Sequence, residues 1–135
     1  MPIHYPAQGH TIVDGVYVEQ FYLDGGGQPT FMEQFVAFGQ AYEAGEVLGK
    51  ITATGILTKC DPAAGDGSET PFAILMEDLD LTAAAANEEV SVLTTSNRTI
   101  NFKALVFNAA WDKKELRAAL SLRGIQTRTQ MYSAI

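Results

Sequence analysis

The chain has 135 residues, of which 47% are hydrophobic and 19% are charged, and its formal net charge is −7 at pH 7. This length and composition are typical of one folded, soluble domain with its own core, and no apolar run approaches the roughly 20 residues of a membrane-spanning helix. The acidic balance disfavours nucleic-acid binding, which needs a basic face, and the single cysteine, Cys60, excludes an internal disulfide.

The N-terminal part is predicted to be an arm followed by a hairpin. Residues 1–10 contain two prolines and two histidines without periodicity, which predicts an extended arm, and the lack of a basic start and a hydrophobic run predicts no signal peptide. Apolar residues partly alternate from Thr11 to Leu23, and Asp14-Gly15 predicts a hairpin turn between two strands. Gly25-Gly26-Gly27 predicts a loop; without a following lysine it does not match a phosphate-binding loop.

Two strand-like stretches follow. Phe31 to Phe38 is rich in aromatic residues and predicts a strand whose side chains lie in the core or in a subunit contact. Ala44 to Lys59 is β-rich and interrupted by three glycines, which predicts a bent or bulged strand. Cys60 to Ser68 is dense in turn-forming residues, and we interpret Cys60 as a small residue at a strand end without a reactive thiolate.

The second half contains the remaining strands. Phe72 to Met76 is a short continuous apolar run, which favours a strand buried on both faces. Ala83 to Ala86 fits either one helical turn or a tight loop. Val90 to Thr95 alternates and leads through Ser96-Asn97 to a second apolar stretch ending at Phe107, which predicts a second hairpin-like pair.

One helix is predicted over residues 112–123. Asp112 and Glu115 have the spacing of a capping box, Leu116 and Leu120 share one face, and Leu122 lies on an adjoining stripe. Arg123-Gly124 is a typical helix end, and Ile125 to Thr129 alternates as a last strand. Together these elements predict a mixed, β-rich α+β fold, with residues 11–135 as one small barrel-like or sandwich-like domain.

The charges are divided unevenly along the chain. Residues 1–96 carry two basic and fourteen acidic side chains, a net −12, whereas residues 97–135 carry seven basic and two acidic side chains, a net +5. Because the basic residues lie mainly on one short helix beside acidic neighbours, we expect the opposite charges to meet inside the fold or across a subunit contact.

No catalytic, cofactor or metal site is predicted. Both histidines, His4 and His10, lie near the N-terminus without helical ligand spacing, so neither a zinc site nor the base of a serine hydrolase is indicated. The acidic groups around Asp78 and Asp66 lack the alternating ligand spacing of a calcium loop. A small metal-binding or ligand-binding β-domain, with hydrolytic activity based on these acidic loops, remains an alternative.

Several short motifs resemble a known family in their order and spacing. These are Gly45-Glu-Val-Leu-Gly-Lys-Ile-Thr-Ala-Thr-Gly55, the loop Asp61-Pro-Ala-Ala64, the strand and acidic turn from Phe72 to Asp80, the stretch from Asn101 to Phe107, and the helix end Leu122-Arg-Gly-Ile125. Over residues 44–128 the chain resembles the head decoration proteins of tailed bacteriophages, the family of the lambda capsid-stabilising protein. A tail or baseplate module built on the same scaffold is a further alternative.

The resemblance implies a structural virion protein that is not an enzyme and needs no cofactor. It implies a homotrimer on the exterior of the expanded head, bound to the major capsid protein and stabilising the head against DNA pressure, with the host cytoplasm as its location before assembly. It also implies an N-terminal arm that becomes ordered on the capsid, and it involves neither membrane nor direct nucleic-acid contact. Our candidates for capsid contact are Tyr5, His10, Ile12 and Val13, although Ile12 and Val13 could equally pack on their own domain.

The segment Phe21 to Phe38 matches this family poorly. It could be an inserted hairpin that reaches a neighbouring trimer, or part of a subunit contact. No subunit-interface residues are predicted.

Overall fold

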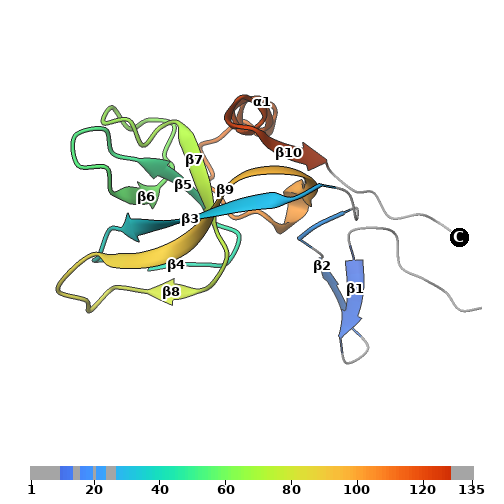
Figure 1. Cartoon of the computed structure of the whole chain (residues 1–135), viewed down its shortest axis with the longest axis horizontal. Helices are drawn as coiled ribbons and strands as arrows, with labels where there is room; N and C mark the ends of the chain where they lie inside the picture. The colour runs from blue at the N-terminus through green and yellow to red at the C-terminus, as the bar shows by residue number, and fades with distance from the viewer. Residues whose placement is uncertain (1–9, 14–15, 20, 24–26, 129–135) are drawn as a thin grey trace, which may run out of the picture.

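The computed structural model describes residues 10–13, 16–19, 21–23 and 27–128 (Figure 1). The strands are β1 (His10–Val13), β2 (Val16–Glu19), β3 (Pro29–Val36), β4 (Ala41–Tyr42), β5 (Val47–Lys50), β6 (Leu57–Lys59), β7 (Pro71–Leu75), β8 (Leu79–Asp80), β9 (Glu88–Asn101) and β10 (Ile125–Arg128). The helices are a short 3₁₀ turn, η1 (Phe102–Ala104), and one α-helix, α1 (Lys113–Arg123).

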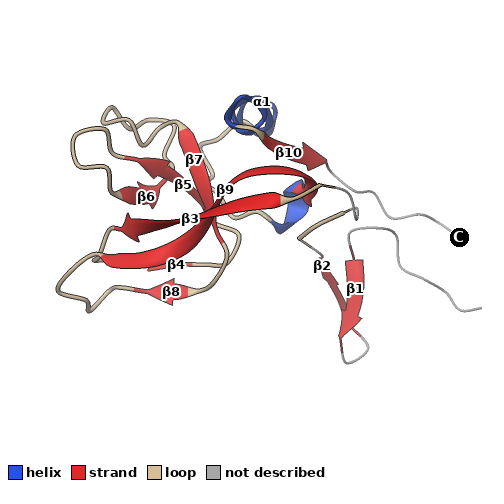
Figure 2. Cartoon of the chain, viewed as in Figure 1, coloured by secondary structure: helices blue, strands red, loops and turns tan. Residues whose placement is uncertain are grey.

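Five strands close into a small barrel. Their order is β9-β3-β6-β5-β7, and β7 pairs again with β9, so the sheet returns to its first strand (Figure 2). Strand β10 pairs in parallel with β9 outside this ring, and α1 packs near β7 and β10. The β-rich α+β fold with a small barrel-like domain and one helix near the C-terminus, which the sequence predicts, is therefore confirmed.

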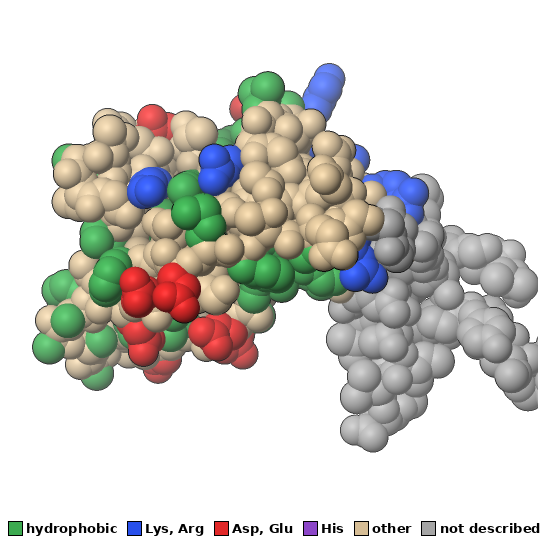
Figure 3. All heavy atoms as spheres, in the orientation of Figure 1, with side chains coloured by type: hydrophobic (Ala, Val, Ile, Leu, Met, Phe, Trp, Pro, Cys, Tyr) green, Lys and Arg blue, Asp and Glu red, His purple; other side chains and the backbone are tan. Residues whose placement is uncertain are grey.

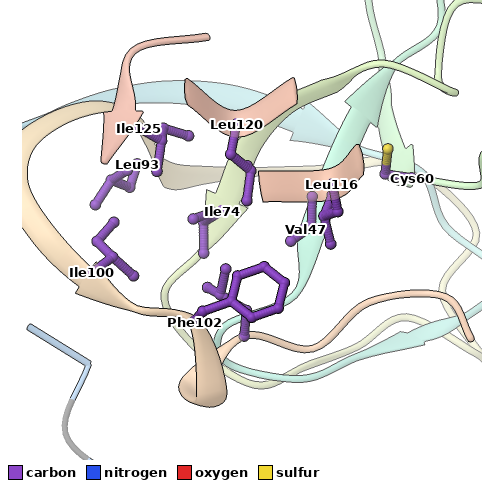
Figure 4. Packing of buried hydrophobic residues seen from close by; sticks show 10 residues of the cluster. Val47, Cys60, Ile74, Leu93, Ile100, Phe102, Leu116, Leu120 and Ile125 are labelled. Carbon is purple, nitrogen blue, oxygen red and sulfur yellow. The ribbon is translucent and has the colours of Figure 1, made fainter. Parts of the chain in front are cut away.

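The apolar side chains form two clusters on the two faces of the sheet. All five barrel strands contribute to the first, which we call the barrel core: Val36, Tyr42, Leu48, Leu57, Ala73, Leu75, Leu81, Val90 and Val92. The second, which we call the helix core, lies between the outer face of the barrel and α1 (Figure 4): Val47, Cys60, Ile74, Leu93, Ile100, Phe102, Leu105, Leu116, Leu120 and Ile125.

Strand β7 separates the two cores. Ala73 and Leu75 point into the barrel core while Ile74 points into the helix core, because side chains alternate along a strand. All three residues are fully buried. The prediction of a strand buried on both faces is confirmed, and it explains why this segment reads as a continuous apolar run.

The ribbon of β4 and β8 closes one end of the barrel. It pairs Ala41 with Asp80 and Tyr42 with Leu79. Tyr42 is buried in the barrel core, and its hydroxyl donates to the carbonyl oxygen of Ala37 at 2.7 Å. The hydroxyl group of this buried tyrosine therefore has a hydrogen-bond partner inside the fold.

The predicted bent strand from Ala44 to Lys59 is wrong, because this stretch forms a hairpin. Strands β5 and β6 are antiparallel, with Lys50 opposite Leu57, and a loop connects them. Gly55 has φ of 73° in this loop, so it supports the chain reversal rather than a bulge. Gly49 lies at a register shift between β5 and β7, which agrees with the expected bulge, although the stretch as a whole is not one strand.

Gly49→Ala should destabilise the fold by about 1–3 kcal/mol. A Cβ at this position would collide with the backbone carbonyl oxygen of Ser68, which cannot move away as a flexible side chain would. Urea unfolding monitored by circular dichroism measures the change. Gly65→Ala is the matched control, since a Cβ there meets no atom within 4 Å; equal effects of the two variants would contradict the close approach.

The predicted hairpin across Ser96-Asn97 is also wrong, because β9 runs without interruption for 14 residues. Ser96 lies opposite Pro29 of β3 on one side and Ile125 of β10 on the other. Two flanking strands thus hold this segment extended, although its residue types favour a turn. The second apolar stretch continues into η1 rather than returning as a strand.

Helix α1 agrees with the prediction in its position and buried face. Leu116 and Leu120 are fully buried, and Gly124 ends the helix with φ of 94° and its N–H bonded to the carbonyls of Leu120 and Ser121. Two details of the prediction for this helix are wrong. Asp112 is the N-cap but makes no side-chain capping bond, and Leu122 is 91% exposed because it lies about 200° around the helix from Leu120.

Candidate functional site

The acidic side chains near Asp61 and Asp78 are used to hold turns. Asp61 Oδ1 accepts from the backbone N–H of Ala63 at 2.9 Å, and Asp78 Oδ1 accepts from Ala44 N–H at 2.8 Å. Hydrogen bonds from Ser68 lower the pKa of Asp66, and hydrogen bonds from Thr82 lower the pKa of Asp80. Among the described residues, no group of three histidine, cysteine or acidic side chains converges to hold a metal ion.

Cys60 belongs to the helix core and is buried. Burial raises the pKa of its thiol to about 12. The indole N–H of Trp111 donates to the backbone carbonyl of Cys60 at 3.2 Å, which fixes the chain just before α1 against β6. Cys60 is therefore a structural residue, as the sequence predicts.

We expect native Cys60 to resist thiol reagents at pH 8, because the reactive thiolate is hardly populated. Its folded pKa of about 12 exceeds that of an unfolded cysteine, roughly 8.5. The stability from this group is therefore complete below about pH 8.5 and is lost as the pH rises toward about 12. Reaction with a chromogenic disulfide reagent, with and without denaturant, measures the protection; immediate reaction of the native protein would contradict it.

Three of the four predicted capsid-contact residues lie in β1. His10 is opposite Glu19, Ile12 is opposite Tyr17, and Val13 is opposite Val16 in an antiparallel pair with β2. The predicted pairing of two strands is confirmed, and they form a two-stranded sheet of their own beside the barrel (Figure 1); the predicted turn, Asp14-Gly15, lies outside the described residues. Tyr5 and the arm as far as residue 9 lie outside the described residues.

Strand β3 exposes apolar side chains. Phe31, Met32 and Phe35 are nearly half exposed, at 46%, 46% and 47%, whereas Val36 is buried in the barrel core. The core alternative for this aromatic segment is therefore wrong for these three residues. On one side β3 pairs with β9 along its length; on the other it pairs with β6 only at Val36, so among the described strands most of that edge has no partner.

A groove of about 870 Å³ lies between η1, α1 and β10. Its floor contains Phe102, Leu105 and Phe107, with the two phenyl rings 5.3 Å apart. Four cationic side chains also line it: Lys103, Lys113, Lys114 and Arg117. The guanidinium of Arg117 lies 5.6 Å from the ring centre of Phe102. We call this surface the basic groove; none of the described residues that line it is acidic.

A second surface, of opposite charge, surrounds the end of the barrel closed by β4 and β8. Its acidic side chains are Asp80 at the end of β8 and Glu88 and Glu89 at the start of β9, all exposed. Phe38 lies beside them, 50% exposed, and its N–H donates to Asn87 Oδ1 at 3.1 Å. We call Phe38, Asp80, Glu88 and Glu89 the acidic tip. Acidic side chains gather over β4 and β8 in Figure 3.

Neither surface was assigned from the sequence, which offers only partial signals for them. The excess of basic residues after position 96 indicates a positive surface, but not that η1 and α1 form a groove. Phe38 belongs to the predicted aromatic segment, yet its exposure depends on β3 ending at Val36. The sequence could not show that Phe38 lies beside Glu88, since the two are 50 positions apart.

A closed barrel with exposed apolar residues on one strand, and with a basic groove and an acidic tip, is typical of a binding and assembly module. Within the described part of the chain, neither helix has the length and apolar composition of a membrane span. The family profile described as bacteriophage lambda head decoration protein D matches residues 11–125. The chain therefore belongs to this family of head decoration proteins, as the resemblance indicates.

A comparison with individually curated proteins gave no match. Membership of the family makes this a structural protein of the phage head, found in the virion. The match begins at residue 11 and includes the segment from Phe21 to Phe38, so the interpretation of this segment as a poor match to the family is wrong.

Proposed function

We propose that this protein binds the exterior of the expanded phage head as a homotrimer, contacts the major capsid protein and stabilises the head against the pressure of packaged DNA. The observation that carries this proposal is the family match over residues 11–125. Before assembly the protein would reside in the host cytoplasm.

The surfaces of the barrel are compatible with self-association in a ring. A basic groove and an acidic tip on one chain are complementary between two copies, and such a head-to-tail contact closes when three copies are related by a threefold axis.

Capsid contact is assigned to the N-terminal arm and the hairpin that follows it. Tyr5, His10, Ile12 and Val13 are the proposed contact residues. An extended arm can add a strand to an exposed sheet edge of the capsid, where main-chain hydrogen bonds provide affinity and side-chain pockets provide specificity. Three arms on one trimer bind far more tightly than one, because the first contact raises the effective concentration of the others.

The proposal is tested by DNA retention in expanded heads that lack their decoration protein. Heads saturated with this chain should retain packaged DNA at temperatures at which bare heads release it, because each bound trimer bridges neighbouring capsid subunits. Unexpanded proheads provide the control for specific attachment. Equal release from decorated and bare heads would contradict the stabilising role.

A further inference from the structure

The basic groove and the acidic tip of one chain lie on different sides of the molecule. Helix α1, which lines the groove, covers the outer face of the barrel, whereas the ribbon of β4 and β8 closes one end (Figure 1). A chain with both surfaces so placed cannot insert its own tip into its own groove. Their complementarity can be used only between molecules.

The acidic tip has the composition of a segment that docks in a pocket. Leu81 and Ala84 anchor the loop between β8 and β9 on the barrel core. Gly39 N–H donates to the carbonyl of Leu81 at 2.8 Å, which holds the chain after Phe38 against this loop. An exposed aromatic ring is thus presented by a braced backbone, and little conformational freedom is lost when it binds.

The basic groove provides the matching chemistry. Its floor is aromatic and aliphatic, so it can accept a phenyl ring, and the four cations that line it can meet carboxylates around that ring. Val36, two residues before Phe38, pairs with Glu88, and the N–H of Phe38 donates to Asn87 Oδ1, so Phe38 follows β3 beside the start of β9. The apolar centre and charged surround of the tip therefore correspond to the apolar floor and charged lining of the groove.

We propose that the basic groove is the subunit contact of this protein, and that it receives the acidic tip of a second copy, with Phe38 on the aromatic floor and Asp80, Glu88 and Glu89 near its lysines and Arg117. The inference rests on the proposed homotrimer, for which it names the interface. The contact is heterologous, so each chain of a trimer uses its groove once and its tip once.

Sedimentation velocity over a range of protein concentrations tests this assignment. Phe38→Ala should weaken self-association at least about tenfold, because an exposed aromatic anchor is removed without disturbing either core. Phe31→Ala is the matched control, since Phe31 is exposed to a similar extent but lies outside the tip. Equal association of these two variants would overturn the proposal.

Charge reversal provides a second, independent test. The pair Lys113→Glu and Lys114→Glu should weaken association, and so should the pair Glu88→Lys and Glu89→Lys; all four substitutions in one chain should restore it. Glu33→Lys, on exposed β3, is the control for a reversed charge outside the tip. High salt should also weaken association of the unaltered chain, because dissolved ions screen the attraction between the charges of the groove and those of the tip.

The outcomes separate this inference from the proposed function. Trimers that persist in every groove and tip variant would overturn the interface and leave the head-binding role intact. Loss of head binding by groove variants that remain trimeric would assign the groove to an acidic capsid segment and overturn the proposal as well. An unaltered chain that is monomeric at all concentrations yet binds heads would overturn both the homotrimer and this interface; failure to bind heads would reject the function itself.

Discussion

Deleting residues 1–10 should leave a folded trimer that binds expanded heads at least about a hundredfold more weakly. Among the described residues, the buried members of the two cores lie between Val36 and Ile125, so we expect the shortened chain to fold. Binding should fall steeply because each trimer loses three linked contacts at once. Co-sedimentation with heads measures the binding, and circular dichroism with sedimentation velocity establishes that the shortened chain is folded and trimeric.

Deletion of residues 1–9 is the sharper companion variant, because His10 is the first residue of β1 and pairs with Glu19. A loss of binding in both variants assigns the contact to the arm itself, whereas a loss only in the longer deletion assigns it to the hairpin. Full binding by the chain that lacks residues 1–10 would refute the arm assignment.

Leu120→Ala should lower the free energy of unfolding by about 2–5 kcal/mol. Leu120 is fully buried in the helix core among residues of α1, β7 and β10, so the smaller side chain leaves a cavity and loses contacts on several sides. Because whole domains are stabilised by only about 5–15 kcal/mol, this change removes a large share of the total. Chemical denaturation monitored by circular dichroism measures it.

The same helix offers a matched control for this substitution. Leu122→Ala makes the identical chemical change two residues away, where the side chain is 91% exposed, and should alter stability by less than about 0.5 kcal/mol. Similar losses in the two variants would contradict the packing of α1 on the barrel.

Local patterns predicted the elements whose structure depends on near neighbours. The run from Phe72 to Met76 corresponds to β7, the helix begins and ends within a residue of the prediction, and the strands before and after Asp14-Gly15 pair with each other. Gly124 takes the left-handed backbone that glycine favours at a helix end. In each case a few adjacent residues contain the physical signal.

The errors arise where partners distant in the sequence decide the conformation. Ser96 stays extended because β3 and β10 flank it, although Ser-Asn is common in turns. Gly49 allows the backbone of Ser68 to approach closely, and the spacing of the glycines in the sequence does not predict this contact. Phe31 and Phe35 are apolar, yet each is nearly half exposed. The hydrophobicity of a residue alone does not show whether its side chain is buried in the core or lies on the surface.

The candidate surfaces also depend on residues that are distant from one another in the sequence. The charge asymmetry of the chain indicated that opposite charges would meet, but the basic groove exists only because η1, α1 and β10 converge. Asp61, Asp66 and Asp80 belong to the acidic loops for which the sequence allows a metal site as an alternative. In the structure each of them accepts hydrogen bonds within a local turn.

Titration of the purified chain against expanded heads lacking their decoration protein tests the central claim most directly. Co-sedimentation should give saturable binding, with three copies at each occupied site, and far less binding to unexpanded proheads. A chain that stays in the supernatant with expanded heads, at concentrations at which it is folded, would contradict attachment to the head.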